Sequence, residues 1–270
     1  MNDSHSDYLQ ELREKISSYK QKATEKQSEF VENETQRLSW LEGDLDELGN
    51  NIINSVFYGF ENDEFDKCRK TACRKVRSLI RFYQILGSAF PSECVEVQEH
   101  FLSMEEGDEG GHGHFVENLE QDLEDDQDLL LNDIIPMSIV VNLLAVIENF
   151  LDGTVKCAAA IAEPKDNLKK GKYDNINYHI QRLKKLYGIP IKLDKNTNKS
   201  LDSMREFRNQ FLHELGRDLP EQIEQMLNEW YGATNLAECN EEFVFKSFHT
   251  TWEILLKVSE VYISWKEKKC

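Results

Sequence analysis

Apolar residues recur at steps of three and four along several long segments of this chain. That period places them on one face of an α-helix, because a helix turns by about 100° per residue. In the second half we expect four such helices: residues 133–161, 173–186, 201–216 and 240 onward. Together with a short helix starting near Asp218, they predict an all-α bundle over residues 129–270.

The first half begins with a polar segment that we expect to form one long helix over residues 1–50. Its apolar positions make only a thin stripe, and residues 20–36 are almost all charged or amide-bearing. Such a helix is either exposed over most of its surface or packs against another chain as a dimerisation arm. Gly49-Asn50-Asn51 is a typical stop signal and predicts its end.

A second helix, predicted over residues 64–87, carries the main basic cluster of the chain. Five of its cations step by three or four and therefore share one helix face: Lys67, Lys70, Arg74, Arg77 and Arg81. Arg69 and Lys75 add two more charges beside them. This face is either a solvated surface that offsets the acidic segment after it, or a track that binds phosphate groups.

An acidic segment separates the two halves. Residues 82–155 contain no Lys or Arg, and acidic side chains gather in 104–128 around a glycine-rich stretch with His112 and His114. No further ligand stands at a fixed spacing from these histidines, so we expect no metal site. We therefore expect three segments: an N-terminal helical region (1–103), an acidic linker (104–128) and the bundle (129–270).

Composition limits the kinds of function that this chain can have. Its 270 residues are 40% hydrophobic, enough for a sizeable core, and its net charge is −18. An acidic protein does not attract nucleic acid by its overall charge, so an RNA site would have to be a local basic patch.

The sequence predicts a cytoplasmic protein. The residues from Met1 onward are polar and do not resemble a signal peptide. The longest apolar run, Ile134 to Leu144, is interrupted by Pro136, Ser138 and Asn142, so no membrane span is expected. The six cysteines are scattered without a CxxC pair, which indicates reduced thiols.

The most distinctive motif is Arg208-Asn209-Gln210-Phe211-Leu212-His213 on the helix expected over residues 201–216. Asn209 and His213 are four residues apart and share a stripe opposite the apolar face. Arg208 is directed to the edge of that face, where its charge needs a partner or a wet cleft. Arginine can hold a phosphate oxygen, and histidine can transfer protons near neutral pH.

This motif resembles the HEPN superfamily (higher eukaryotes and prokaryotes nucleotide-binding). Members carry Arg, four to six further residues and His on the third helix of an all-α, up-down four-helix bundle, with Asn, Asp or His favoured after the Arg. Here the spacer is four residues and Asn209 follows Arg208. An upstream apolar helix with Ile147-Glu148-Asn149-Phe150 fits the same pattern. The resemblance covers about the last half of the chain.

The resemblance implies a metal-independent endoribonuclease that needs no cofactor. Two copies of the chain would bring their motifs together, with Arg208 holding the phosphate, His213 transferring the proton, Asn209 orienting it and Glu148 in support. Arg205, Lys70, Arg74, Arg77 and Arg81 are further candidates for RNA-phosphate contacts. Many such proteins are toxins or phage-defence effectors, so RNA, a second copy and an antitoxin are the expected partners.

Two alternatives remain open at this stage. Arg208 and His213 could be ordinary surface residues, with Arg208 paired to Glu148 or another acid. The protein would then be a non-catalytic helical module that assembles other proteins, which the net charge of −18 favours.

Overall fold

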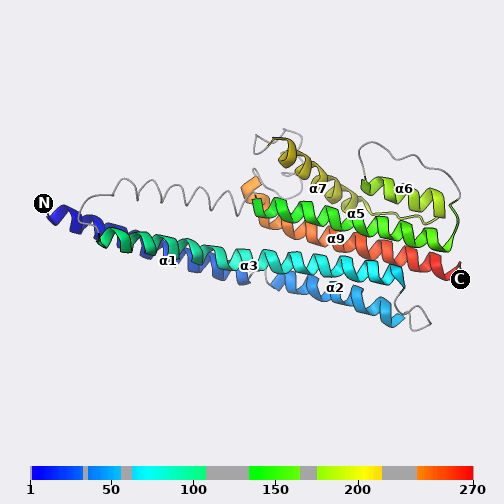
Figure 1. The fold of residues 1–270 in the computed structure, drawn as a ribbon, viewed down its shortest axis with the longest axis horizontal. Helices are drawn as coiled ribbons and strands as arrows, with labels where there is room; N and C mark the ends of the chain where they lie inside the picture. The colour runs from blue at the N-terminus through cyan, green and yellow to red at the C-terminus, as the bar shows by residue number, and fades with distance from the viewer. Residues whose placement is uncertain are drawn as a thin grey trace. The chain divides into compact units, whose positions relative to one another are not determined.

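The computed structural model describes residues 2–32, 36–55, 63–107, 134–164, 175–214 and 236–269. Over these residues the chain forms helices and no strands, which confirms the all-α prediction (Figure 1). The helices are α1 (Asn2–Phe30), α2 (Gln36–Ser55), α3 (Glu64–Gly107), α5 (Ile135–Ile161), α6 (Asn175–Tyr187), α7 (Lys195–Glu214) and α9 (Leu236–Glu267). The short helix expected near Asp218 and the histidines at 112 and 114 lie outside the described residues.

The chain divides into two compact units, and each unit combines two segments that are separated in the sequence. Unit 1 contains residues 1–39 and 81–135, and unit 2 contains residues 40–80 and 136–270. Residues 40–80, expected in the N-terminal region, therefore group with the C-terminal helices. The bundle is consequently larger than the segment 129–270.

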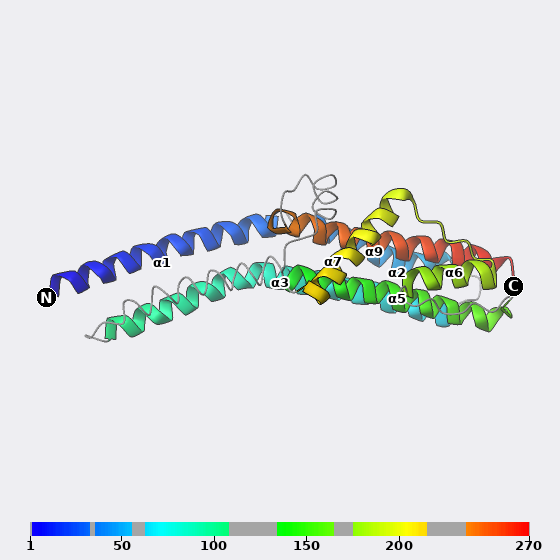
Figure 2. The ribbon, with the colours of Figure 1, turned by 90° about the horizontal axis from the view of Figure 1, so that it is seen from above.

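Unit 1 is built on a pair of antiparallel helices, α1 and the part of α3 that follows Arg81 (Figure 2). Phe30 meets Tyr83 edge to face, with ring centroids 5.4 Å apart. Ten residues earlier on α1, Lys20 forms an ion pair with Glu99, further along α3. Gly87 permits the close approach, because a Cβ there would stand 2.2 Å from the Phe30 ring.

Two predictions for the first half were wrong in their boundaries. The expected single helix over residues 1–50 is divided into α1 and α2, and α2 continues past Gly49-Asn50-Asn51 to Ser55. The basic helix does not end near residue 87 but continues to Gly107. Stop signals of this kind describe local preference, and burial of Leu41, Leu45 and Leu48 along α2 outweighs them.

The core of unit 2 contains an aromatic cluster where α3, α5 and α9 meet. Phe65 of α3 stacks on Tyr262 of α9, with centroids 4.0 Å apart and planes 19° from parallel. Phe65 also packs near Phe150 of α5, with ring centroids 5.9 Å apart and planes tilted by 45°. Each fully buried aromatic side chain of this size contributes roughly 2 kcal/mol by leaving water. This cluster fixes the start of α3 against both long helices.

The end of α6 is fixed by local backbone geometry and by α9. Gly188 has a φ of 70°, which favours glycine, and follows the last residue of α6. The amides of Gly188 and Ile189 donate to the carbonyls of Lys184 and Leu183, which closes the helix in a Schellman motif. Trp265 Nε1 donates to the Tyr187 carbonyl at 3.0 Å and ties this end to α9. The helix therefore ends within one residue of the end expected from the sequence, residue 186.

The helix α5 is the most apolar of the described helices. By length and composition alone it is the one helix among the described residues that could cross a membrane. The residues that interrupt its sequence, Ser138 and Asn142, are exposed and do not break the helix. Ile139, Leu143 and Ile147 are completely buried, as expected for the central helix of a bundle, and such helices meet the same criteria.

Candidate functional site around Arg208

The helix α7 begins earlier than the sequence predicted. Ser200, just before the expected start at residue 201, lies inside the helix. Asp194 is the cap, since its Oδ1 accepts from the amides of Asn196 at 2.8 Å and Thr197 at 3.0 Å. These hydrogen bonds lower the pKa of Asp194, with the Thr197 hydroxyl contributing most.

The helix α7 is held antiparallel to α9 by apolar and polar contacts. Phe207 packs on Phe243 with centroids 4.6 Å apart. The buried Thr250 hydroxyl donates to Ser200 Oγ at 2.6 Å, and Thr197 Oγ1 donates to Glu253 at 3.0 Å. The apolar face predicted from the sequence is buried at Leu201, Met204 and Phe207. These contacts fix the rotation of α7 about its own axis, and with it the position of Arg208, where the motif begins.

The motif arginine lies between two of the residues proposed to act with it. Arg208 Nη1 stands 3.6 Å from Glu148 Oε1 on α5. Its Nη2 donates to Asn209 Oδ1 at 3.3 Å. The side chains of Arg208 and Glu148 keep 28% and 26% of their surface exposed, so the pair is reachable from water. The expectation that Arg208 lies at the edge of the apolar face agrees with this position.

The motif histidine lies on the same helix. Because α7 extends to Glu214, His213 is one helical turn beyond Asn209. The side chain of His213 is outside the described part of the chain, as is that of Phe211. The structure therefore brings together Arg208, Asn209 and Glu148.

The candidate phosphate-binding residues differ in their exposure and in their ion-pair partners. Arg205 pairs with Asp202 on its own helix at 3.0 Å. Arg77 is paired with Asp46 of α2, whereas Arg74 is exposed and Lys70 is half-buried. Arg81 is also exposed and falls in unit 1.

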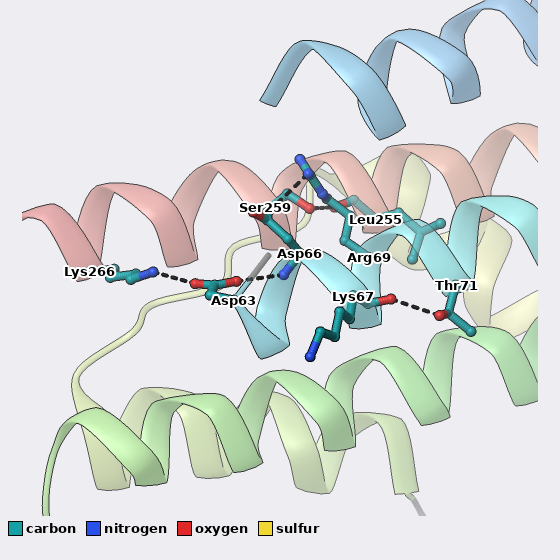
Figure 3. A network of polar contacts seen from close by, with 8 residues as sticks. All are labelled: Asp63, Asp66, Lys67, Arg69, Thr71, Leu255, Ser259 and Lys266. Carbon is teal, nitrogen blue, oxygen red and sulfur yellow. Dashed lines mark hydrogen bonds and ion pairs between the residues drawn. The ribbon is translucent and has the colours of Figure 1, made fainter. Parts of the chain in front are cut away.

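One basic residue that the sequence placed beside the surface cluster is fully buried. Arg69 has no exposed surface, and its Nη2 donates to Asp66 Oδ1 at 3.0 Å (Figure 3). Its Nε and Nη1 have no hydrogen-bond partner among the described residues. Burial lowers the pKa of Arg69, and burial also raises the pKa of Asp66 despite the neighbouring guanidinium.

A second ion pair lies at the start of α3. Lys266 of α9 pairs with Asp63, whose Oδ1 also accepts the Asp66 amide at 2.7 Å (Figure 3). The spacing of Phe65, Arg69, Cys73, Val76 and Ile80 could have revealed the burial of Arg69, because it places the arginine on the apolar face.

Other histidines of unit 2 lie beside single carboxylates. His179 Nδ1 is 3.8 Å from Asp152, and His249 Nδ1 is 3.6 Å from Glu253. His179 keeps only 12% of its side chain exposed. In the described ranges no three His, Cys, Asp or Glu side chains form a group that could hold a metal ion.

These observations define a protein whose described residues are all-α and divide into two helical units. Comparison with protein-family models, with curated proteins and with solved structures found no match to this chain.

Proposed function

We propose that this chain is a metal-independent endoribonuclease of the HEPN type, acting as a homodimer in the cytoplasm. The observation that supports the proposal is the position of Arg208, half-exposed between Glu148 and Asn209 on the helix that also carries His213. The sequence motif Arg208-Asn209-x-x-x-His213 supplies the resemblance.

The chemistry requires few groups. The 2′-OH of RNA attacks the adjacent phosphate, its proton leaves, and the 5′ oxygen departs with a proton to give a 2′,3′-cyclic phosphate and a 5′-OH end. His213 suits the proton transfer because imidazole titrates near neutral pH. Arg208 suits the phosphate because its charge persists and its planar fork fits two oxygens.

The loose contact between Arg208 and Glu148 is compatible with this role. At 3.6 Å the two groups form an ion pair without a short hydrogen bond, and both remain partly solvated. A phosphate dianion or diester could therefore replace the carboxylate as the partner of Arg208, while Glu148 and Asn209 orient the guanidinium beforehand. The same pair is also what a simple surface arrangement of Arg208 predicts.

A composite site in a dimer follows from the geometry of one helix. Arg208 and His213 are about 140° apart around α7, so a single copy cannot direct both at one phosphate. Two copies related by a twofold axis would place an arginine and a histidine on opposite sides of the same RNA. A toxin or phage-defence role, restrained by an antitoxin, would suit such a nuclease.

The second candidate is a non-catalytic module that assembles proteins. The helical pair of unit 1 favours it, because Val31, Phe82 and Ile85 expose between 45% and 62% of their surface there. Large apolar side chains exposed along one helical pair are typical of protein-binding surfaces.

The deciding experiment measures RNA cleavage by the purified full-length chain in the presence of EDTA. We expect products with 2′,3′-cyclic phosphate ends, and loss of cleavage in His213→Ala and Arg208→Ala. His249→Ala is the matched control, since it also removes a histidine, but on α9, where it lies beside Glu253. Cleavage that persists in His213→Ala at the wild-type rate rejects the proposal and leaves the assembly module.

A further inference from the structure

A pocket of about 480 Å³ lies in unit 2 between α3 and α5. Its floor is apolar, with Phe150 and Ala72 buried, and Gly153 contributes no side chain. A volume of this size is typical of small-molecule sites, which hold a ligand with a mainly apolar lining and a few polar groups. This pocket is not evident from the sequence, because its walls come from segments about eighty residues apart.

The rim of this pocket carries three ammonium groups in a strongly acidic protein. Lys67 and Lys75 come from α3 and Lys156 from α5, against Glu64 in the lining and Asp152, which pairs with Lys156 from beside it. Figure 3 shows Lys67 extending from α3 toward α5. The excess of positive charge favours an anion here, although the net charge of the chain is −18.

Two of the three lysines already have partners, and the third does not. Lys67 pairs with Glu64 at 2.7 Å and Lys156 with Asp152 at 2.6 Å. Lys75 is exposed, and within the described ranges its ammonium has no hydrogen bond or ion pair. The ammonium group of Lys75 is therefore available to pair with an acidic group of a ligand.

The fields of two lysines meet inside the pocket. Burial raises the pKa of the Cys68 thiol and the carboxylate of Asp152 adds to the rise, whereas the charges of Lys156 and Lys75 both act to lower it. The two ammonium groups thus lie within electrostatic range of the same point, one from each wall. The side chain of Asn149 also lines the pocket and can donate a hydrogen bond to an acceptor.

We propose that the pocket between α3 and α5 binds a small organic anion: an apolar body against Phe150 and Gly153, and an acidic group held by Lys75 and Lys156. The acidic group can be a carboxylate, sulfonate or phosphate, since all three offer oxygens to an ammonium. This site is separate from Arg208, which faces α5 from α7.

The test uses 8-anilinonaphthalene-1-sulfonate, an aromatic sulfonate whose fluorescence rises in apolar surroundings, with the full-length chain. Ala160 is exposed and lines the pocket, so Ala160→Trp fills the pocket with an indole ring. Ala159→Trp is the matched control, because Ala159 is also exposed but does not line the pocket. Lys75→Glu reverses the proposed charge, and Arg74→Glu is its matched control on an exposed residue outside the pocket.

We expect Kd for the sulfonate to rise about tenfold in Ala160→Trp and in Lys75→Glu, and to stay within about twofold in the two controls. The neutral analogue N-phenyl-1-naphthylamine should lose binding in Ala160→Trp but not in Lys75→Glu. If Ala160→Trp does not fold, as judged by circular dichroism, the comparison of Lys75→Glu with Arg74→Glu decides alone. No saturable binding to the wild-type chain, or equal Kd values within each matched pair, overturns the proposal.

Discussion

Arg69 and Asp66 lie one turn apart on α3, and both side chains are buried, with Nη2 of the arginine 3.0 Å from Oδ1 of the aspartate (Figure 3). Asp66 also faces Asp63, which pairs with Lys266 of α9. A buried charge is tolerated only when it is paired, because removing an ion from water is costly. The pair therefore couples the start of α3 to the packing of the bundle.

Removing Arg69 alone should destabilise the protein strongly. Arg69→Ala leaves Asp66 buried without its cation, and breaking such a pair costs about 3–5 kcal/mol of unfolding free energy. The double variant Arg69→Met/Asp66→Leu removes both charges and keeps apolar volume, so we expect it to recover most of that loss. Urea denaturation followed by circular dichroism measures both. A double variant that is less stable than Arg69→Ala would show that the ion pair itself is stabilising.

The cap of α7 gives a second prediction, for stability and pH. Asp194→Ala should lower the unfolding free energy by about 1 kcal/mol, whereas Asp194→Asn should lower it less because an amide oxygen still accepts from the backbone.

The pKa of Asp194 is lowered by the Thr197 hydroxyl and by backbone amides. Its ionised form is therefore favoured by folding, and this contribution is present above the unfolded pKa near 3.8 and is lost as pH falls through the lower, folded value. In Asp194→Asn that acid dependence should be weaker. Equal pH profiles for the wild type and Asp194→Asn would contradict this.

The helices of this protein were predictable where apolar periodicity and local signals agreed. The segments now seen as α5, α6 and α9 began within a few residues of the expected positions, and α6 ended within one residue of the expected end. Local signals failed where tertiary burial opposed them, as at Gly49 in α2. They also failed where two caps competed, because Asp194 and Ser200 are both acceptable N-cap residues.

The candidate site was predictable only in part. The position of Arg208 at the edge of the apolar face followed from its phase on the helix, but its contact with Glu148 depends on how α5 and α7 pack. The burial of Arg69 was missed because a run of cations was interpreted as one exposed cluster. The pocket could not be inferred, since Cys68 and Cys157 come together only when α3 lies against α5.

Thiol reactivity gives a third prediction. Burial raises the pKa of the Cys157 thiol to about 11 from a usual value of 9.0. Because the thiolate is the reactive form, alkylation of Cys157 at pH 8 should be about a hundredfold slower than in the urea-unfolded chain. The rate should then rise about tenfold per pH unit up to about pH 11 in the folded protein. Iodoacetamide labelling with peptide mass spectrometry measures this, and the same experiment reports on Cys73, whose pKa burial also raises to about 11. Rapid labelling of Cys157 at pH 7 would contradict the prediction.

The role proposed for Glu148 gives the last prediction, which separates support from proton transfer. Glu148→Gln keeps the size of the side chain and an oxygen near Arg208 but removes the charge that attracts the guanidinium. If Glu148 only orients Arg208, the single-turnover rate of RNA cleavage should fall by about tenfold or less, whereas His213→Ala should lower it by about 10²–10⁴-fold. The stability of Glu148→Gln should stay within about 1 kcal/mol of the wild type, because the pair with Arg208 is partly solvated.

Glu206→Gln, at an exposed position on α7, is the matched control and should leave the rate unchanged. A loss in Glu148→Gln as large as that in His213→Ala would instead make Glu148 a proton-transfer group, and the pH–rate profile of the two variants would then have to be compared to assign the acid and the base.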